Sequence, residues 1–166
     1  MFKLSERAFS VFLLIVAGMG AATILGCGVA ETPFADPGPD TECPVCGMRV
    51  ADYPAWVARV EFQDGSVEFF DGAKDMFKFL QDIPKYRPEM TVDQVAAISV
   101  TEYETARRID ARTASFVIGS DVSGPMGNEL VPFESEDAAA EFRAVHSGER
   151  IVRFDEVDQD LISELQ

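Results

Sequence analysis

Apolar and polar residues alternate along residues 56–62, as they do in a half-buried strand. The turn at residues 63–65 contains Asp-Gly, which readily adopts the positive φ angles of a tight hairpin, and residues 66–70 then predict the returning strand. Asp71 is placed to cap a helix that runs to about Ile83. The apolar stripe of this helix consists of Met76, Phe79, Leu80 and Ile83, spaced for one helical face.

The same pattern occurs again 63 residues later. This shift aligns three apolar residues of the first unit with three of the second: Val67 with Leu130, Phe70 with Phe133, and Phe79 with Phe142. Strands are predicted at 115–118 and 129–133, joined by a longer hairpin loop from Gly119 to Asn128. Ser135 is placed to cap a second helix ending near Val145.

Weaker patterns complete each unit. One further strand is predicted after each helix, at 97–103 and at 151–154, and a short helix near the end of the chain carries Val157, Leu161 and Leu165. The acidic segment 155–164 is expected to face solvent or to dock a basic partner. A ββα unit is too small to bury both of its faces alone. We therefore predict an α+β protein of two related ββα(β) halves, 43–105 and 106–166, packed together, although short hairpins can also match by chance.

The first residues have the pattern of an export signal. Lys3 and Arg7 precede a run without charge from residue 8 to residue 25, and Ile24-Leu25-Gly26-Cys27 resembles a bacterial lipobox. The pattern predicts a signal peptide at 1–26 and lipidation of Cys27, with an uncleaved membrane anchor as the alternative. Residues 27–42 are rich in proline and glycine and predict a lipid-anchored linker.

The charge of the chain excludes one class of partner. Lys and Arg number 14 against 29 Asp and Glu, for a formal net charge of −15. Nucleic-acid binding requires clustered cations to contact phosphates, so we expect no nucleic-acid partner. An acidic chain is also repelled by anionic membranes, and the acyl chains on Cys27 would supply the attachment instead.

Two cysteines three residues apart follow the linker, in Cys43-Pro44-Val45-Cys46-Gly47-Met48. Such a pair can help to close a zinc site, but only two thiols and one distant histidine are available, and carboxylates would have to complete the site. A thioredoxin-like dithiol needs a helix immediately after the pair, and none is predicted here. A simple disulfide is the third interpretation.

Methionines add a fourth interpretation. Thioethers suit Cu(I) and do not suit Mg²⁺ or Ca²⁺. Met48 adjoins the cysteines, and Met126 lies in the loop Ser123-Gly124-Pro125-Met126-Gly127, where no periodic pattern buries it. That loop could reach Cys46 and Met48 if the two halves meet. Met76 and Met90 are assigned to packing, and His146 to the end of the second helix, where a polar side chain offsets the helix dipole.

Taken together, these motifs resemble the NosL family of bacterial lipoproteins. They are Cys43 to Met48, the ββα unit, Gly124-Pro125-Met126-Gly127 and Leu130-Val131-Pro132-Phe133. The resemblance implies Cu(I) binding and delivery of copper, through periplasmic maturation factors, for the multi-copper centre of nitrous-oxide reductase. It maps the metal ligands most directly onto Cys46 and Met48, then onto Met126, and leaves Cys43 less certain.

The sequence therefore predicts a metallochaperone without enzymatic activity, anchored to a membrane, facing the periplasm, and monomeric or weakly dimeric. A membrane-tethered thiol-disulfide oxidoreductase using Cys43 and Cys46 is the alternative, and a structural zinc lipoprotein is a third possibility.

Overall fold

The computed structural model describes residues 36–166. The predicted signal peptide, Cys27 and the first part of the linker lie outside the described residues. Four antiparallel strands form the first sheet: β1 (Ala58–Phe62), β2 (Val67–Phe70), β3 (Val95–Thr101) and β4 (Arg108–Asp110), in the order β2-β1-β3-β4. Helices α1 (Ala73–Gln81) and α2 (Ile83–Tyr86) connect β2 to β3.

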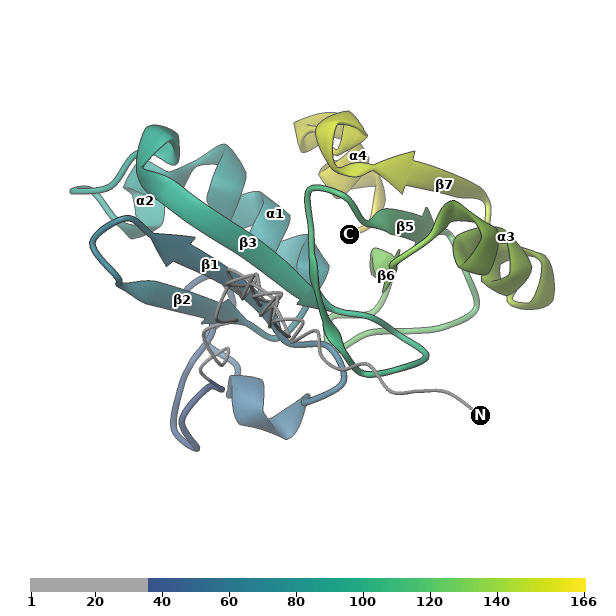
Figure 1. Cartoon of the computed structure of the whole chain (residues 1–166), viewed down its shortest axis with the longest axis horizontal. Helices are drawn as coiled ribbons and strands as arrows, with labels where there is room; N and C mark the ends of the chain where they lie inside the picture. The colour runs from purple at the N-terminus through teal and green to yellow at the C-terminus, as the bar shows by residue number, and fades with distance from the viewer. Residues whose placement is uncertain (1–35) are drawn as a thin grey trace, which may run out of the picture. The chain divides into compact units, whose positions relative to one another are not determined.

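The second sheet repeats the arrangement with three strands. It consists of β5 (Ser115–Ile118), β6 (Val131–Phe133) and β7 (Arg150–Arg153), antiparallel in the order β6-β5-β7. Helix α3 (Glu136–Val145) connects β6 to β7, and α4 (Gln159–Glu164) ends the chain. Each half therefore places its third strand beside its first, with a helix between the second and third strands (Figure 1).

This topology confirms the predicted α+β class with two related units, and the sheets remain separate. The 63-residue shift holds for the second strand and the helix of each unit but not for the other strands, because the hairpin loop is longer in the second half and the connection after the helix is longer in the first. Strand β4 follows the predicted division at residue 105 and nevertheless pairs with β3. The sequence repeat and the sheet boundary thus differ by a few residues.

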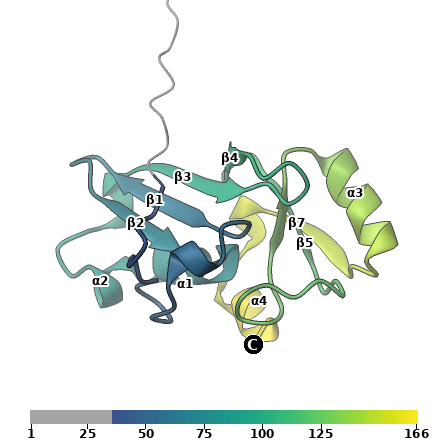
Figure 2. The same ribbon diagram turned by 90° about the horizontal axis from the view of Figure 1, so that it is seen from below.

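The larger of two hydrophobic clusters in the described residues is shared by both halves, and α1 lies within it. Phe77 contacts Phe116 of β5, with ring centroids 5.3 Å apart, and also Phe154, at 5.1 Å. On its other side α1 packs against β1 and β2, and α4 lies beside it where the halves meet (Figure 2). Because neighbours surround the start of α1, even Lys74 and Asp75 are buried there.

Two local predictions were wrong at their boundaries. The first strand begins at Ala58, and Trp56 lies before it, half-buried against Tyr103 with ring centroids 5.8 Å apart. Asp71 does not cap α1: the N-cap is Gly72, and no side chain of its own segment caps the helix. The Asp71 carboxylate is hydrogen-bonded elsewhere, to a cysteine.

Candidate metal centre

The cysteine motif folds into a tight hairpin. The Cys43 N–H donates to the Met48 carbonyl at 2.8 Å, and the Gly47 N–H donates to the Cys43 carbonyl at the same distance. Gly47 has a φ of 76°, in the left-handed region where glycine is favoured, so the chain can reverse within this short segment. The hairpin places both cysteine side chains on one side. Neither cysteine is in a disulfide.

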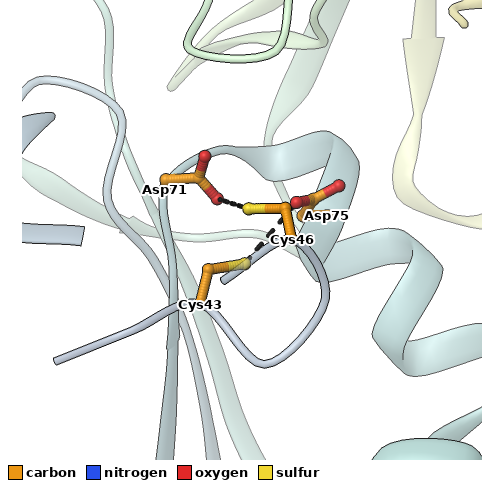
Figure 3. A group of neighbouring side chains, drawn as sticks. All are labelled: Cys43, Cys46, Asp71 and Asp75. Atoms are coloured by element: carbon orange, nitrogen blue, oxygen red, sulfur yellow. Dashed lines mark hydrogen bonds between the residues drawn. The ribbon is translucent and has the colours of Figure 1, made fainter. Parts of the chain in front are cut away.

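Two carboxylates at the start of α1 lie against these thiols. The Cys46 Sγ donates to Asp71 Oδ1 at 3.3 Å, and the Cys43 Sγ donates to Asp75 Oδ2 at 3.5 Å (Figure 3). The four ligand atoms lie within 4.8 Å of one another and could hold a metal ion. We call Cys43, Cys46, Asp71 and Asp75 the thiol–carboxylate cluster.

The surroundings keep the two thiols protonated. Burial raises the pKa of Cys43 well above its ordinary value, and the adjacent Asp71 carboxylate raises it further. Burial likewise raises the pKa of Cys46 to about 12, with contributions from Asp75 and Asp71. Backbone N–H groups directed at the two sulfurs oppose these increases in part. Four negative charges in so small a volume would repel one another, and the retained protons avoid this.

One predicted thioether ligand, Met48, lies between Cys46 and Asp71 in the sequence, and the other, Met126, lies in the second half. Met48 is half-buried at the end of the hairpin. Met126 occupies the tip of a tight turn closed by reciprocal backbone hydrogen bonds between Gly124 and Gly127, at 2.8 and 3.1 Å. Its side chain is 44 % exposed, so it does not fill a core. Its role as a ligand stays a prediction, as does that of Met48.

The Met126 turn is attached to α1 by buried charged groups. Lys74 Nζ donates to the Met126 carbonyl at 2.9 Å, and Glu129 Oε1 accepts from the Lys74 backbone N–H at 2.6 Å. Burial raises the pKa of Glu129 to about 7, although the two backbone donors and the Lys74 charge oppose the increase. The first turn of α1 is thus held by a carboxylate from the other half of the chain.

The remaining candidates have structural roles, as predicted. Met76 is fully buried and Met90 is 6 % exposed, both in the shared core. His146 follows the last turn of α3, where its Nδ1 lies 2.9 Å from Asp121 Oδ1 and its ring stacks on Phe142.

Sequence reasoning missed four polar residues. Asp71 was assigned to a cap, and Asp75, Lys74 and Glu129 were not considered. Asp71 precedes the helix and Asp75 lies in its first turn, so helical spacing alone does not place the two carboxylates together. No sequence signal identifies Glu129, which becomes a partner of α1 only when the two halves pack together.

Together these features define an α+β protein with a sulfur- and carboxylate-containing candidate metal centre where a hairpin meets a helix start. The model of the NosL family matches residues 34–162, and the chain belongs to this family.

One relative and one solved structure give the extent of the similarity. The copper-binding lipoprotein NosL of Stutzerimonas stutzeri is 30 % identical over 159 residues, which cover 90 % of this chain and 82 % of the relative. The crystal structure of the copper chaperone NosL from Shewanella denitrificans is 29 % identical, with a TM-score of 0.65, and the match covers 76 % of this chain and 96 % of that one. Within residues 36–166, no helix is both long and apolar enough to cross a bilayer.

Proposed function

We propose that this protein binds Cu(I) with the thiolates of Cys43 and Cys46 and the thioethers of Met48 and Met126, and passes the ion to a partner. The observation that carries the proposal is the convergence of two free thiols with two carboxylates, in a chain whose relatives are named for copper binding. Thiolate and thioether sulfur are the ligands that Cu(I) prefers.

The hydrogen-bonded carboxylates suit a site that is loaded and unloaded. Without metal, each thiol donates its proton to an aspartate, so both sulfurs are held near one point. When Cu(I) binds, each coordinating thiol loses its proton and a sulfur–copper bond replaces the S–H bond. Release reverses the exchange, and the protons return to the sulfurs.

The oxidoreductase alternative is disfavoured by the same surroundings. A dithiol that attacks disulfides needs a thiolate of lowered pKa, usually at a helix N-terminus. Here burial and two carboxylates raise the pKa of both thiols. The segment after the hairpin is only the short 3₁₀ turn Val50–Asp52.

A competition titration against a Cu(I) chelator tests the proposed ligands. It uses the full chain in detergent under reducing conditions. We expect one tightly bound ion, weaker binding by Met48→Leu and Met126→Leu, and unchanged binding by Met90→Leu, which alters a buried thioether outside the site. Equal affinity in all three variants and the wild type would contradict ligation by thioethers.

Zinc is the second candidate, because the cluster offers two sulfurs and two oxygens, a donor set that Zn²⁺ accepts. Binding of Cu(I) and binding of Zn²⁺ should respond differently to substitutions at the site. Asp71→Asn should weaken Zn²⁺ more than Cu(I), whereas Met126→Leu should affect only Cu(I). X-ray absorption of the loaded protein would show sulfur neighbours alone for Cu(I), and oxygen neighbours as well for Zn²⁺.

We further propose that Cys27 anchors the protein to a membrane on its periplasmic side. The protein would then deliver copper for nitrous-oxide reductase through periplasmic maturation factors. Mass spectrometry of the mature N-terminus tests the acyl chains on Cys27. Nitrous-oxide reduction by cells carrying Cys46→Ser, grown at limiting copper, tests delivery. Normal activity in those cells would contradict the delivery role.

A further inference from the structure

Lys74 is a buried cation with every donor engaged. Its side chain is 2 % exposed, and Nζ donates to the carbonyls of Met126 at 2.9 Å, Asn128 at 2.6 Å and Leu165 at 3.2 Å. An ammonium group has three hydrogens, and these three acceptors use them all. One acceptor lies in the turn that carries Met126 and another directly follows that turn, so this cation fixes the turn to the helix bearing Asp75.

Glu129 completes the attachment from the opposite direction. Its Oε1 accepts the backbone N–H of Lys74 at 2.6 Å and that of Leu130 at 3.0 Å. The carboxylate lies so close to α1 that a Cβ on Gly72 would be 2.4 Å from Oε2. Gly124, at the base of the Met126 turn, is also close to Glu129: a Cβ there would be 2.9 Å from the Glu129 Cβ and 3.2 Å from its Oε2. Glycines at both positions admit the carboxylate between the helix and the turn.

These contacts join the turn to the helix start that carries the two aspartates of the candidate metal centre. Gly72 and Lys74 lie between Asp71 and Asp75 in the sequence, and both aspartates belong to the thiol–carboxylate cluster. The other end of the loop is fastened separately, where the Asp121 N–H donates to the His146 carbonyl at 2.9 Å.

We propose that Lys74 and Glu129 form a clasp that positions the Met126 thioether toward the thiol–carboxylate cluster, so that copper affinity depends on two residues that do not bind copper. The proposal rests on the assignment of Met126 as a ligand in the proposed function. Lys74 and Glu129 are positioning residues, since they act through the backbone of the turn.

Charge and position both predict weaker binding when Lys74 is removed, and they differ in whether the effect depends on Met126. Two thiols lose their protons when one Cu(I) binds, so the site becomes more negative and a nearby cation favours the loaded state. Charge alone therefore predicts that Lys74→Leu weakens copper binding with or without Met126. Loss of a positioned ligand predicts weaker binding only when Met126 is present. Lys78→Leu is the matched control, because Lys78 lies on the same helix with Nζ 3.2 Å from Asp75 Oδ1.

A double-mutant cycle separates these effects. We expect Lys74→Leu to weaken Cu(I) binding by about 10- to 100-fold, the range usual for groups that orient a ligand. In a Met126→Leu background the same change should have no more than a twofold effect. Lys78→Leu removes a charge but no positioned ligand, and it should leave affinity unchanged or slightly lowered. X-ray absorption should show one fewer sulfur neighbour in both Lys74→Leu and Met126→Leu.

The outcomes distinguish failure of the clasp from failure of the ligand assignment. If Met126→Leu binds Cu(I) as the wild type does, Met126 is not a ligand and the clasp has nothing to position. If Met126→Leu weakens binding but the effect of Lys74→Leu simply adds to it, the ligand assignment stands and the clasp is overturned. If Lys74→Leu is unfolded by circular dichroism, Gly72→Ala replaces it. This change displaces Glu129 and should also remove one sulfur neighbour, and an unchanged sulfur count would overturn the clasp.

Discussion

The two halves of the molecule share a topology but begin their helices differently. Helix α3 is capped locally: Ser135 Oγ accepts from the Ala138 N–H at 3.2 Å, and Glu136 and Asp137 face solvent in the first turn. Helix α1 has Gly72 at the same position and no side-chain cap from its own segment. Its first turn is buried and is held by Glu129 from the other half.

The two helix starts differ in whether they depend on contacts from the other half of the chain. A serine cap satisfies an N–H group at the helix start from within its own segment, and the other free N–H groups can bond to water, so the first turn can lie exposed. A helix capped by a distant carboxylate has its first turn covered, and that environment allows two acids and two thiols to lie together. The candidate metal centre occupies the helix start that depends on tertiary contacts.

Removing either thiol should weaken Cu(I) binding more than any other single change at the site. Cys46→Ser and Cys43→Ser each replace a soft sulfur with a hard oxygen that Cu(I) accepts poorly. We expect each change to weaken Cu(I) binding by more than the 10- to 100-fold of an orienting residue, measured by chelator competition. Retained affinity in Cys43→Ser would show that Cys43 is not a ligand.

Copper affinity should also rise with pH. Because burial and the carboxylates raise the pKa of both thiols, each coordinating sulfur must release a proton at neutral pH. The apparent affinity should increase about tenfold per pH unit for each thiol that ligates, up to the pKa of Cys46 at about 12. Titrations at pH 6.5, 7.5 and 8.5 measure the slope. A flat profile would contradict ligation by thiols that must lose a proton before they bind copper.

The same raised pKa values have a consequence for the apo protein. The folded state holds these thiol protons more tightly than the unfolded state does. Their contribution to stability is therefore complete below the ordinary thiol pKa of 9.0 and is lost as pH rises through the value of about 12 for Cys46. Thermal unfolding of the apo protein between pH 8 and pH 11 checks this direction.

Adding a methyl group to the start of α1 should destabilise the fold. In Gly72→Ala the new Cβ would lie 2.4 Å from Glu129 Oε2, and the carboxylate is held in place by two backbone donors. Overpacking of this kind costs about 1–3 kcal/mol of the free energy of unfolding. Urea unfolding measures it, and stability equal to the wild type would show that Glu129 can move away freely.

The corresponding change in the second half should be milder and local. Ser135→Ala removes the cap of α3 and should lower the free energy of unfolding by about 1 kcal/mol. It should leave Cu(I) affinity unchanged, because α3 begins away from the thiol–carboxylate cluster. A loss of affinity would show that the two helix starts are coupled.

The fold was largely accessible from the sequence because its determinants are local. Alternation in residues 56–62, the Asp64-Gly65 turn and the Ser135 cap each depend on near neighbours, and the corresponding elements appear within a few residues. Strand β4 was missed, since a three-residue strand has too few positions to show alternation.

The candidate site was predicted only in part. The spacing of Cys43 and Cys46 identified the sulfur chemistry. Asp71 was assigned to a cap because an aspartate before a helix usually acts as one, and only the folded hairpin shows that a cysteine takes this carboxylate instead. Lys74 and Glu129 are 55 residues apart, and their pairing requires the packing of one half on the other.

The two sulfurs differ in how far they can be reached from outside. Cys43 is 1 % exposed, whereas Cys46 is only partly covered. If the centre passes its ion to another protein as proposed, an incoming ligand would meet Cys46 before Cys43. The exchange would then begin at the exposed sulfur and finish at the buried one.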